Sequence, residues 1–430
     1  MSALPDGIEL TELDGGLRIV TETVPSVRSV ALGLWVRTGS RDEDPEHAGV
    51  SHFLEHLLFK GTERHSAIEI SELFDGMGAA VNAATSKEST HLHARLLDEH
   101  VDEAFALASE MFLAPSLPPD EIDSERDVVL EEIAMYEDEP QDRVHDVLAE
   151  AVFGEHPLGR RVLGTAEVIG SIPVPEIAAY HRARYTASGI VVAAAGHLDH
   201  ERIVSLAREH LRPPAEPSAG ANGAGDPDDV RFRFYPKDTE QYHICFGGRG
   251  IARNDDRRYA LAVLDSAFGG SVSSRLFTEV REKRGLAYSI GSYSEQYVDR
   301  GLVALYVGTR EDNVAEACEI IGRELVRLRD GGLDDDELRR AKEHIKGRMV
   351  LSLESTSARG SRIARGILFD VPLLSLDEML DEVERVTADD VGELAQGLYD
   401  PARLSAACVG PDEDRFRSAA GQVSEALAAA

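Results

Sequence analysis

The feature that most constrains the fold of this chain is an internal repeat. Three short segments of the first half recur in the second half, in the same order and 213 to 216 positions later. They are VDEA from Val101 and VAEA from Val314, LPPDE from Leu117 and LDDDE from Leu333, and a Tyr that precedes small apolar residues up to a Gly, at Tyr185 and Tyr399. The nearly constant offset is half of the 430 residues, which indicates a duplicated domain.

A stretch rich in Pro, Gly and Ala separates the two halves. It has no apolar periodicity and no large side chain to bury, which is typical of a flexible surface crossing. We therefore predict a first domain over 1–212, a flexible linker over 213–229 and a second, homologous domain over 230–430. Hydrophobic residues make up 43% of the chain, enough for each half to bury a core of its own.

Each half mixes strand and helix patterns. Alternating apolar residues predict strands over 30–36, 91–97 and 242–246. Helical periodicity predicts helices over 46–59, 101–112, 118–137 and 257–268, and another that follows a Gly-Gly turn and runs up to 284. Strands joined by hairpins beside runs of helices indicate an α+β class, in which each domain packs a mostly antiparallel sheet against helices.

The composition narrows the classes of partner and the compartment. Against 45 basic residues stand 78 acidic ones, and the net charge of −33 disfavours nucleic acid and anionic membrane surfaces. The charge indicates solubility first and, as the alternative, a preference for basic partners. No apolar run approaches the ~20 residues of a membrane-spanning helix, and the N-terminus lacks the basic residues of a targeting segment. Three widely spaced cysteines provide neither a disulfide framework nor a Cys-based zinc site. We therefore expect a cytoplasmic protein.

The sharpest local signal is the pentapeptide His52-Phe53-Leu54-Glu55-His56. On a helix, the neighbouring apolar residues fall on one side, and His52, Glu55 and His56 fall together on the other. Two imidazoles one turn apart can bind one Zn²⁺, with Glu55 placed to contact a water rather than the metal. The alternative, a solvent-exposed polar helix face, does not require this segregation. The pattern therefore predicts a metal site.

Two histidines leave the site incomplete, because a catalytic zinc takes three protein ligands and keeps an open position. The acidic helix that ends near 137 is the best donor region. Glu125 and Glu132 are two turns apart on it and share one face. From these residues alone, either carboxylate could be the third ligand.

These motifs resemble those of a known family. HFLEHLLFKGT, followed about 75 residues later by ERDVVLEEI, resembles the pitrilysin and mitochondrial-processing-peptidase family of inverted-zincin metallopeptidases. The resemblance covers essentially the whole chain, since it extends to MGAAVNAATSKESTHLHARL and REKRGLAYS. It implies a bacterial-type, single-chain member whose two halves close like a clamshell.

The resemblance also implies roles for individual residues of the first half. In the family, the last ligand is a Glu 76 or 77 positions after the second His, which matches Glu132 because Ile stands at 133. Glu125 matches a Glu that supports the ligands from behind, and Glu131 is the competing position beside Glu132. Asn82 lies where the family has an edge strand that pairs with the substrate, and is expected to orient the scissile carbonyl.

The second half resembles the inactive half of the family. It has no H-x-x-E-H, and at the repeat offset Ala341 and Arg348 stand where the first half has its two Glu. Arg281 and Tyr288, seven positions apart, match an Arg/Tyr pair that the family brings to the zinc site. The resemblance implies that Tyr288 stabilises the oxyanion, and that Arg281 fixes Tyr288 or holds a substrate carbonyl.

Together these inferences predict a zinc endopeptidase with one Zn²⁺ per chain and Glu55 as general base. Its substrates would be unfolded, preferentially basic peptides, cleaved in a cavity between the two halves. Because one chain carries both the zinc motif and the Arg/Tyr pair, we expect a homodimer that needs no other subunit. The alternatives are a subunit of a hetero-oligomeric processing peptidase, a non-catalytic structural relative, and a metal-dependent hydrolase of a non-peptide substrate.

Overall fold

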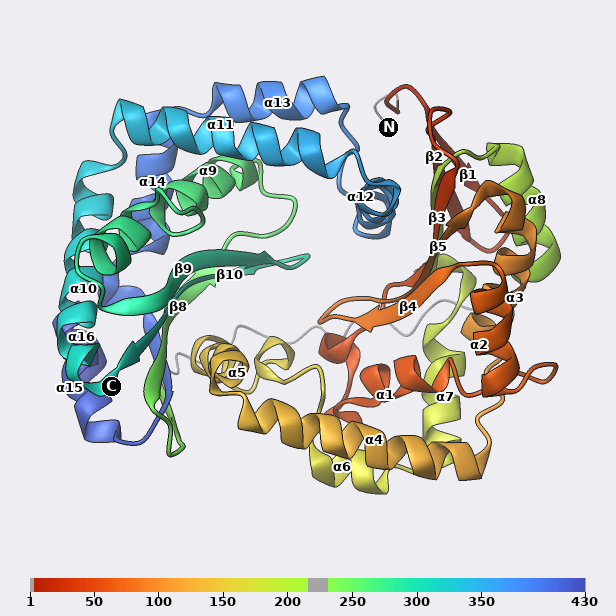
Figure 1. The fold of residues 1–430 in the computed structure, drawn as a ribbon, viewed down its shortest axis with the longest axis horizontal. Coiled ribbons are helices and arrows are strands. Elements are labelled where there is room, and N and C mark those ends of the chain that lie inside the picture. The colour runs from red at the N-terminus through yellow and green to blue at the C-terminus, as the bar shows by residue number, and fades with distance from the viewer. Residues whose placement is uncertain (1–3, 216–230, 430) are drawn as a thin grey trace. The chain divides into compact units, whose positions relative to one another are not determined.

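The computed structural model describes residues 4–215 and 231–429, which form two compact units (Figure 1). Among these residues, unit 1 comprises those up to 133, 161–215 and 351–375, and unit 2 comprises 134–160, 231–350 and those from 376 on. Each unit thus contains a segment from the other half of the chain, which the predicted division at 212 and 230 does not include. The predicted linker lies outside the described residues, apart from its first three positions.

The core of unit 1 is built on a six-stranded sheet. Its order is β1-β2-β6-β3-β5-β4, and every neighbouring pair is antiparallel except β2–β6. The strands are β1 (Ile8–Glu12), β2 (Arg18–Thr23), β3 (Ser29–Val36), β4 (Ala80–Thr85), β5 (Thr90–Leu97) and β6 (Ile190–Gly196). Strand β4 is therefore the last strand on one side of the sheet.

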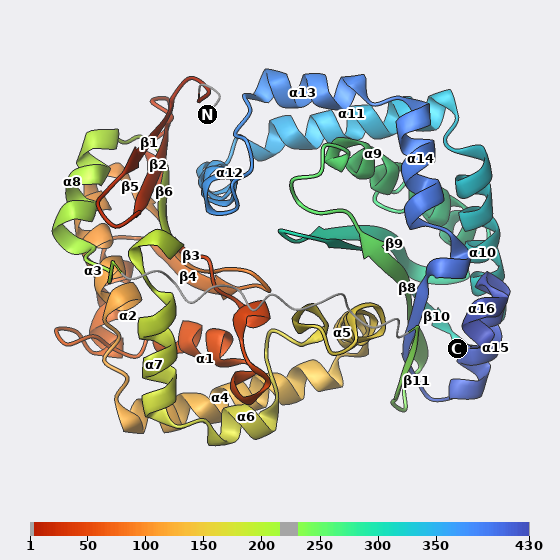
Figure 2. The ribbon, with the colours of Figure 1, turned by 180° about the vertical axis from the view of Figure 1, so that it is seen from behind.

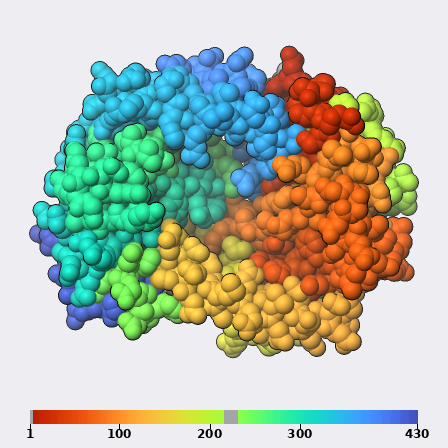
Figure 3. Space-filling view, viewed as in Figure 1, coloured from red at the N-terminus to blue at the C-terminus, as the bar shows by residue number. Residues whose placement is uncertain are grey.

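Helices cover one face of this sheet and enclose a continuous apolar core. They are α1 (Val50–Leu57), α2 (Ala67–Gly76), α3 (Val101–Leu113), most of α4 (Pro119–Asp138), α6 (Ala166–Ser171), α7 (Val174–Arg184) and α8 (His200–His210). The orange to yellow-orange side chains of α2, α3 and α4 form one continuous surface of unit 1 in the space-filling view (Figure 3). None of the described helices is long and apolar enough to cross a membrane.

Unit 2 has a related design around a five-stranded sheet of order β7-β11-β8-β10-β9. Its strands are β7 (Phe232–Pro236), β8 (Gln241–Gly250), β9 (Ala287–Gln296), β10 (Gly301–Arg310) and β11 (Ser405–Gly410), and only β7–β11 is parallel. Its longer helices are α9 (Arg258–Phe268), α10 (Val314–Gly331), most of α11 (Asp335–Ser352), α13 (Leu376–Arg385), α14 (Ala388–Leu398) and α15 (Glu413–Val423). The predicted α+β class with two mostly antiparallel sheets is confirmed.

The second face of each sheet is covered by a helix from the other half of the chain. Helix α12 (Thr356–Leu368) packs on β2, β3 and β6 of unit 1, and α5 (Pro140–Phe153) packs on β7, β8 and β11 of unit 2 (Figure 2). Ion pairs from Arg359 and Arg362 to the buried carboxylate of Glu22 on β2 hold α12 in place. Strands such as β3 are consequently buried along both faces.

Two predicted helices differ from those observed. The helix predicted from residue 46 begins only at Val50, because Pro45–His47 forms a separate 3₁₀ turn and Gly49 takes a left-handed φ of 94°. The helix predicted up to 284 is a short π-helical segment, Phe277–Glu282. The other predicted strands and helices are present within a few residues of their expected bounds.

Candidate metal centre

A buried carboxylate fixes the start of the helix that carries the motif. The Oε2 atom of Glu43 accepts a hydrogen bond from the Gly49 amide at 2.7 Å, and Oε1 accepts one from the Ser51 amide at 2.8 Å. These amides belong to the first turn of α1, where no intrahelical acceptor exists. A Cβ at position 49 would come within 2.6 Å of the Leu163 carbonyl oxygen, so only Gly fits there.

Burial of its apolar stripe determines which face α1 presents. Val50, Phe53, Leu54 and Leu57 have no exposed surface and pack into the core of unit 1. His52, Glu55 and His56 therefore lie on the other face, as the helical pattern predicts.

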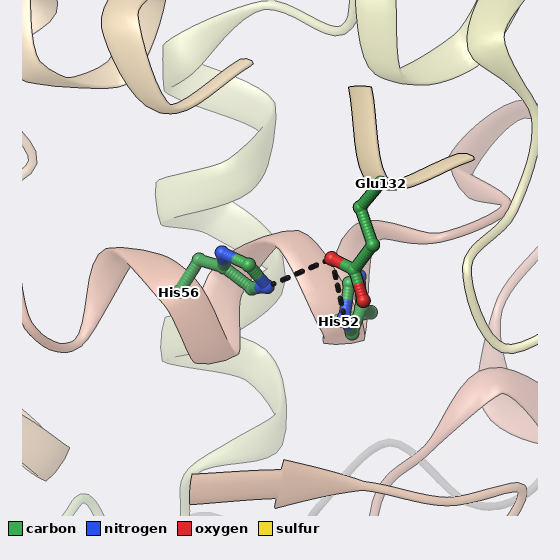
Figure 4. Close-up of side chains that lie close together, drawn as sticks. All are labelled: His52, His56 and Glu132. Carbon is green, nitrogen blue, oxygen red and sulfur yellow. Dashed lines mark ion pairs between the residues drawn. The ribbon is translucent and has the colours of Figure 1, made fainter. Parts of the chain in front are cut away.

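The structure brings Glu132 of α4 against both imidazoles (Figure 4). Its Oε2 atom lies 3.6 Å from Nε2 of His52 and 3.4 Å from Nε2 of His56. Two ligand atoms at 2.0–2.1 Å from a tetrahedral zinc are about 3.3 Å apart, so this spacing fits zinc. These three side chains form the only potential metal-binding group found within the described residues, and Glu131 is not part of it.

Glu125, which is on α4 like Glu132, lies behind the ring of His56. Its Oε1 atom is 2.8 Å from Nδ1 of His56, and its other oxygen pairs with Lys60. With Nδ1 donating its proton to this carboxylate oxygen, Nε2 is the ring nitrogen that a metal would bind. This is the arrangement in which a carboxylate orients a metal-binding histidine.

Charge states in the group also suit a cation. Burial, with help from the neighbouring His56, lowers the pKa of His52 to about 4, so this imidazole is neutral at pH 7. Burial opposes the charged form of His56, but hydrogen bonds to Glu132 and Glu125 outweigh it and raise the pKa, so a metal ion at Nε2 would have to displace the proton that this nitrogen shares with Glu132. The hydrogen bond from His56 lowers the pKa of Glu132, which stays ionised. The group therefore combines imidazole nitrogen with anionic oxygen, a set that zinc prefers.

Glu55 sits between the helix and the terminal strand of the sheet. Burial raises the pKa of Glu55, while hydrogen bonds with Thr85 of β4 and the charge of His56 partly offset that rise. A carboxylate with a raised pKa is a stronger base, which suits proton abstraction near neutral pH.

Asn82 lies on the opposite face of β4 from these groups. Side chains alternate along a strand, and Asn82 is three positions from Thr85, whose side chain faces Glu55. The Oδ1 atom of Asn82 accepts a hydrogen bond from the Ala83 amide at 2.9 Å. The structure therefore does not bring the Asn82 side chain to the three predicted ligands.

Arg281 and Tyr288 form a local pair in unit 2. The Nη1 atom of Arg281 donates to the carbonyl oxygen of Tyr288 at 2.8 Å. Its guanidinium lies 4.6 Å from the ring centre of Tyr288 and 4.7 Å from that of Phe277. Tyr288 is 79% exposed, so its hydroxyl is accessible. The part of this pair in the site of unit 1 stays a prediction.

Sequence reasoning missed Glu43. An acidic residue that caps a helix normally stands at its first turn or just before it. Glu43 is seven positions before Val50, and the 3₁₀ turn at Pro45–His47 folds the chain back to bring its carboxylate to the helix start. The only signal in the sequence is an acidic residue shortly before Pro45.

Known families and proteins resemble this chain over most of its length. Residues 18–166 match the family model described as "Insulinase (Peptidase family M16)", and residues 171–345 match "Peptidase M16 inactive domain". The chain is 42% identical over 419 residues to an uncharacterized zinc protease of Streptomyces coelicolor, covering 96% of this chain and 91% of that protein. It is 42% identical over 385 residues to an uncharacterized zinc protease of Bacillus subtilis, covering 89% and 94%. Its fold is similar to the crystal structure of a protease from Helicobacter pylori, with a TM-score of 0.89 at 22% identity, covering 95% and 100%.

Proposed function

This chain belongs to peptidase family M16, and from this premise we propose that it is a zinc-dependent endopeptidase that hydrolyses unfolded peptides. The observation that carries the proposal is the position of Glu132 Oε2, 3.6 and 3.4 Å from the Nε2 atoms of His52 and His56. The relatives that are named zinc proteases support the same metal.

The chemistry of the donor set supports one zinc ion per chain. His52, His56 and Glu132 would hold it, with Glu125 keeping the His56 ring in the required tautomer. When bound, zinc supplies a Lewis acid that polarises a carbonyl and lowers the pKa of water. Glu132 is only partly buried, so the group is accessible from solvent.

Glu55 would move the proton. Its carboxylate takes a proton from the attacking water and then delivers it to the nitrogen of the leaving amine. Two features support this role: burial raises its pKa, and Thr85 holds the side chain through hydrogen bonds. Burial keeps the carboxylate basic, and the hydrogen bonds with Thr85 keep it oriented while offsetting part of the rise in its pKa.

Tyr288 would donate its hydroxyl to the oxyanion that develops on the substrate. The contact of Arg281 with the Tyr288 carbonyl and ring supports a positioning role for the arginine. This part of the proposal rests on the resemblance of REKRGLAY to the family pattern, together with the exposed hydroxyl.

Strand β4 is the element that suits an extended substrate. It is the terminal strand of its sheet, and it carries Thr85 next to Glu55. An extended peptide that adds to such a strand presents its backbone for hydrogen bonding, which a folded protein cannot do. The net charge of −33 favours basic peptides among these substrates.

The proposal is tested by incubating the purified protein with a diverse mixture of unfolded peptides. Internal peptide bonds should be cut, a zinc chelator should stop cleavage, and added Zn²⁺ should restore it. Cleavage that is insensitive to chelation, or the release of only terminal residues, would contradict the proposal.

A further inference from the structure

Unit 1 contains a cavity of about 160 Å³ that the proposed chemistry does not use. It lies between the sheet and α12, on the face opposite the apolar core that contacts α1. Strands β3 and β5 and helix α12 supply most of its lining, including Trp35, His91, His93, Ser357, Gly360 and Ser361.

Three flat rings form the sheet side of this cavity. The rings of Trp35 and His91 stack with their centres 3.8 Å apart and their planes 2° from parallel. His93 continues the stack at 5.2 Å from His91. A Cβ at Gly33 would lie 2.6 Å from the Trp35 ring nitrogen, so the missing side chain at 33 lets the indole lie across the strand.

The helix side of the cavity is made of small residues. Ser357, Gly360 and Ser361 of α12 face the rings and leave the space between them open. In unit 2, the helix in the corresponding position is α5, and it leaves no such space: its large side chains Val144 and Leu148 are fully buried against the sheet. The hollow in unit 1 is therefore a property of the residues on α12 and not of the architecture.

The lining suits a neutral ring better than a cation. Burial, together with the charges of His93 and Arg365, lowers the pKa of His91 to about 3, so its ring is neutral at pH 7. None of the described residues that line the cavity is a carboxylate that could pair with a cation. A cavity of about 150 Å³ binds benzene in another protein, so one six-membered ring fits here.

We propose that this cavity binds one aromatic side chain of the peptide substrate. The ring would stack on the side of the Trp35–His91–His93 ladder that lines the cavity, beneath the small residues of α12. That the ring belongs to a peptide substrate rests on the proposed peptidase function, whereas binding of the ring in the cavity does not depend on cleavage.

The register of the sheet places this subsite away from the proposed cleavage position. His91 and His93 lie opposite Ala84 and Asn82 on β4, one strand further into the sheet. A peptide added beside β4 would be two strands from β5, about 10 Å away. One side chain does not span that distance, so the aromatic residue belongs at least about three residues from the cleaved bond.

A direct binding test uses the fact that Trp35 is the only tryptophan of the chain. N-acetyl-phenylalanine amide is titrated into the wild-type protein, with the N-acetyl amides of leucine and arginine as comparisons. The phenylalanine probe should change the Trp35 fluorescence in a saturable way, with about tenfold tighter binding than the leucine probe. Equal binding of the three probes, or no change with the phenylalanine probe, would overturn the proposal.

Variants of α12 separate cavity filling from loss of structure. A Cβ at Gly360 would have its nearest neighbour, the Ala31 Cβ, at 3.7 Å, so Gly360→Ala fits and narrows the cavity. Ser357→Leu fills more of it. The matched control is Gly170→Ala on α6 of the same unit, where no described atom lies within 4 Å of the added Cβ. Both α12 variants should weaken the phenylalanine probe several-fold without lowering thermal stability, and the control should bind it like wild type.

The same variants test the link to cleavage. In a peptide series with one Phe moved along the chain, they should lower kcat/KM about tenfold for peptides with Phe three or more residues from the cleaved bond. Peptides with Ala there should be unaffected. If wild type cuts no peptide while the fluorescence response holds, the peptidase function fails and the ring site stands. If cleavage is unchanged in Gly360→Ala and Ser357→Leu for every Phe position, the cavity is not a substrate subsite.

Discussion

The carboxylate of Glu125 accepts a hydrogen bond from Nδ1 of His56, with 2.8 Å between Oε1 and Nδ1. Glu125 is only 6% exposed. This single contact decides which nitrogen of His56 is available to a metal. It also brings α4 to α1, because Glu132 stands two turns further along α4 on the same face. The proposed ligand set is therefore positioned by a hydrogen bond that involves none of the three metal-binding atoms.

We expect Glu125→Gln to weaken zinc binding by about 10–100-fold, the usual loss when such a supporting carboxylate is changed. The amide keeps an acceptor oxygen but loses the charge that strengthens the His56 donor and pairs with Lys60. Competition with a chelator of known affinity measures the change. An unchanged zinc affinity would contradict the role given to Glu125.

Glu132→Gln should reduce zinc retention far more than Glu131→Gln. Only Glu132 has an oxygen beside both imidazoles, and an amide oxygen lacks the negative charge that neutralises the cation. Zinc content after dialysis of the two purified variants gives the comparison. The reverse order, or equal zinc in the two proteins, would show that the ligand is assigned wrongly.

Tyr288→Phe should lower kcat/KM by about 10²-fold, the usual loss of one oxyanion donor. Zinc content and thermal stability should stay at wild-type values, because the hydroxyl is exposed and Arg281 bonds to the backbone carbonyl of Tyr288 and not to the hydroxyl. Full activity in this variant would remove Tyr288 from the proposed mechanism.

Glu43→Gln should destabilise the protein by about 1–3 kcal/mol, because an amide group in this buried position leaves one of the two helix-start amides without an acceptor. The urea midpoint measures the change. Glu46→Gln, on the exposed 3₁₀ turn nearby, is the control and should unfold like wild type. Equal midpoints for the two variants would contradict a structural role for the Glu43 carboxylate.

Asp265 of α9 should make the stability of the protein depend on pH. Desolvation raises the pKa of Asp265 from 3.8 to about 6, against the opposing hydrogen bonds from Ser292 and Ser294. The folded protein therefore holds this proton more tightly than the unfolded chain, and this group lowers the free energy of unfolding as pH rises from about 4 to about 6. The difference corresponds to about 3 kcal/mol.

Asp265→Asn removes this titration. Relative to wild type, the variant should gain stability between pH 4.5 and pH 7, as measured by urea unfolding at both pH values. The same stability difference at the two pH values would show that the carboxyl group titrates normally.

The sequence predicts the residues of the candidate metal centre better than it predicts which segments make up each unit. Because two histidines, a glutamate and an apolar stripe lie within one helix, helical periodicity alone determines which face of α1 carries them. The grouping of Glu132 with His52 and His56 follows from the family spacing, and the structure has the same three side chains together.

The sequence did not allow us to predict that α5 and α12 each pack on the sheet of the unit built mainly from the other half of the chain. Periodicity shows that α12 has an apolar face, but it does not show which sheet that face covers. The contacts that decide it join residues more than 300 positions apart, as in the ion pairs of Arg359 and Arg362 with Glu22. Because α12 covers the second face of the sheet, β3 is buried on both faces, a feature that alternation of apolar residues does not reveal.

The predicted start of α1 is wrong because contacts outside the helical pattern decide where the helix begins. A Pro followed by Glu and His is a common opening of a helix, and the prediction placed the start there. The left-handed Gly49 and the reach of Glu43 to the Gly49 and Ser51 amides move the start to Val50. These are tertiary contacts, which a one-dimensional pattern does not contain.

The most direct test of the proposed function is a paired measurement on Glu55→Gln, with zinc content and peptide cleavage determined on the same preparation. Glutamine keeps the shape of the side chain but cannot take up the proton, and loss of a general base typically costs ~10²–10⁴ in rate. We expect about one zinc per chain, as in wild type, with cleavage reduced by at least about 10²-fold. Cleavage near the wild-type rate by the zinc-loaded variant would contradict the proposed function.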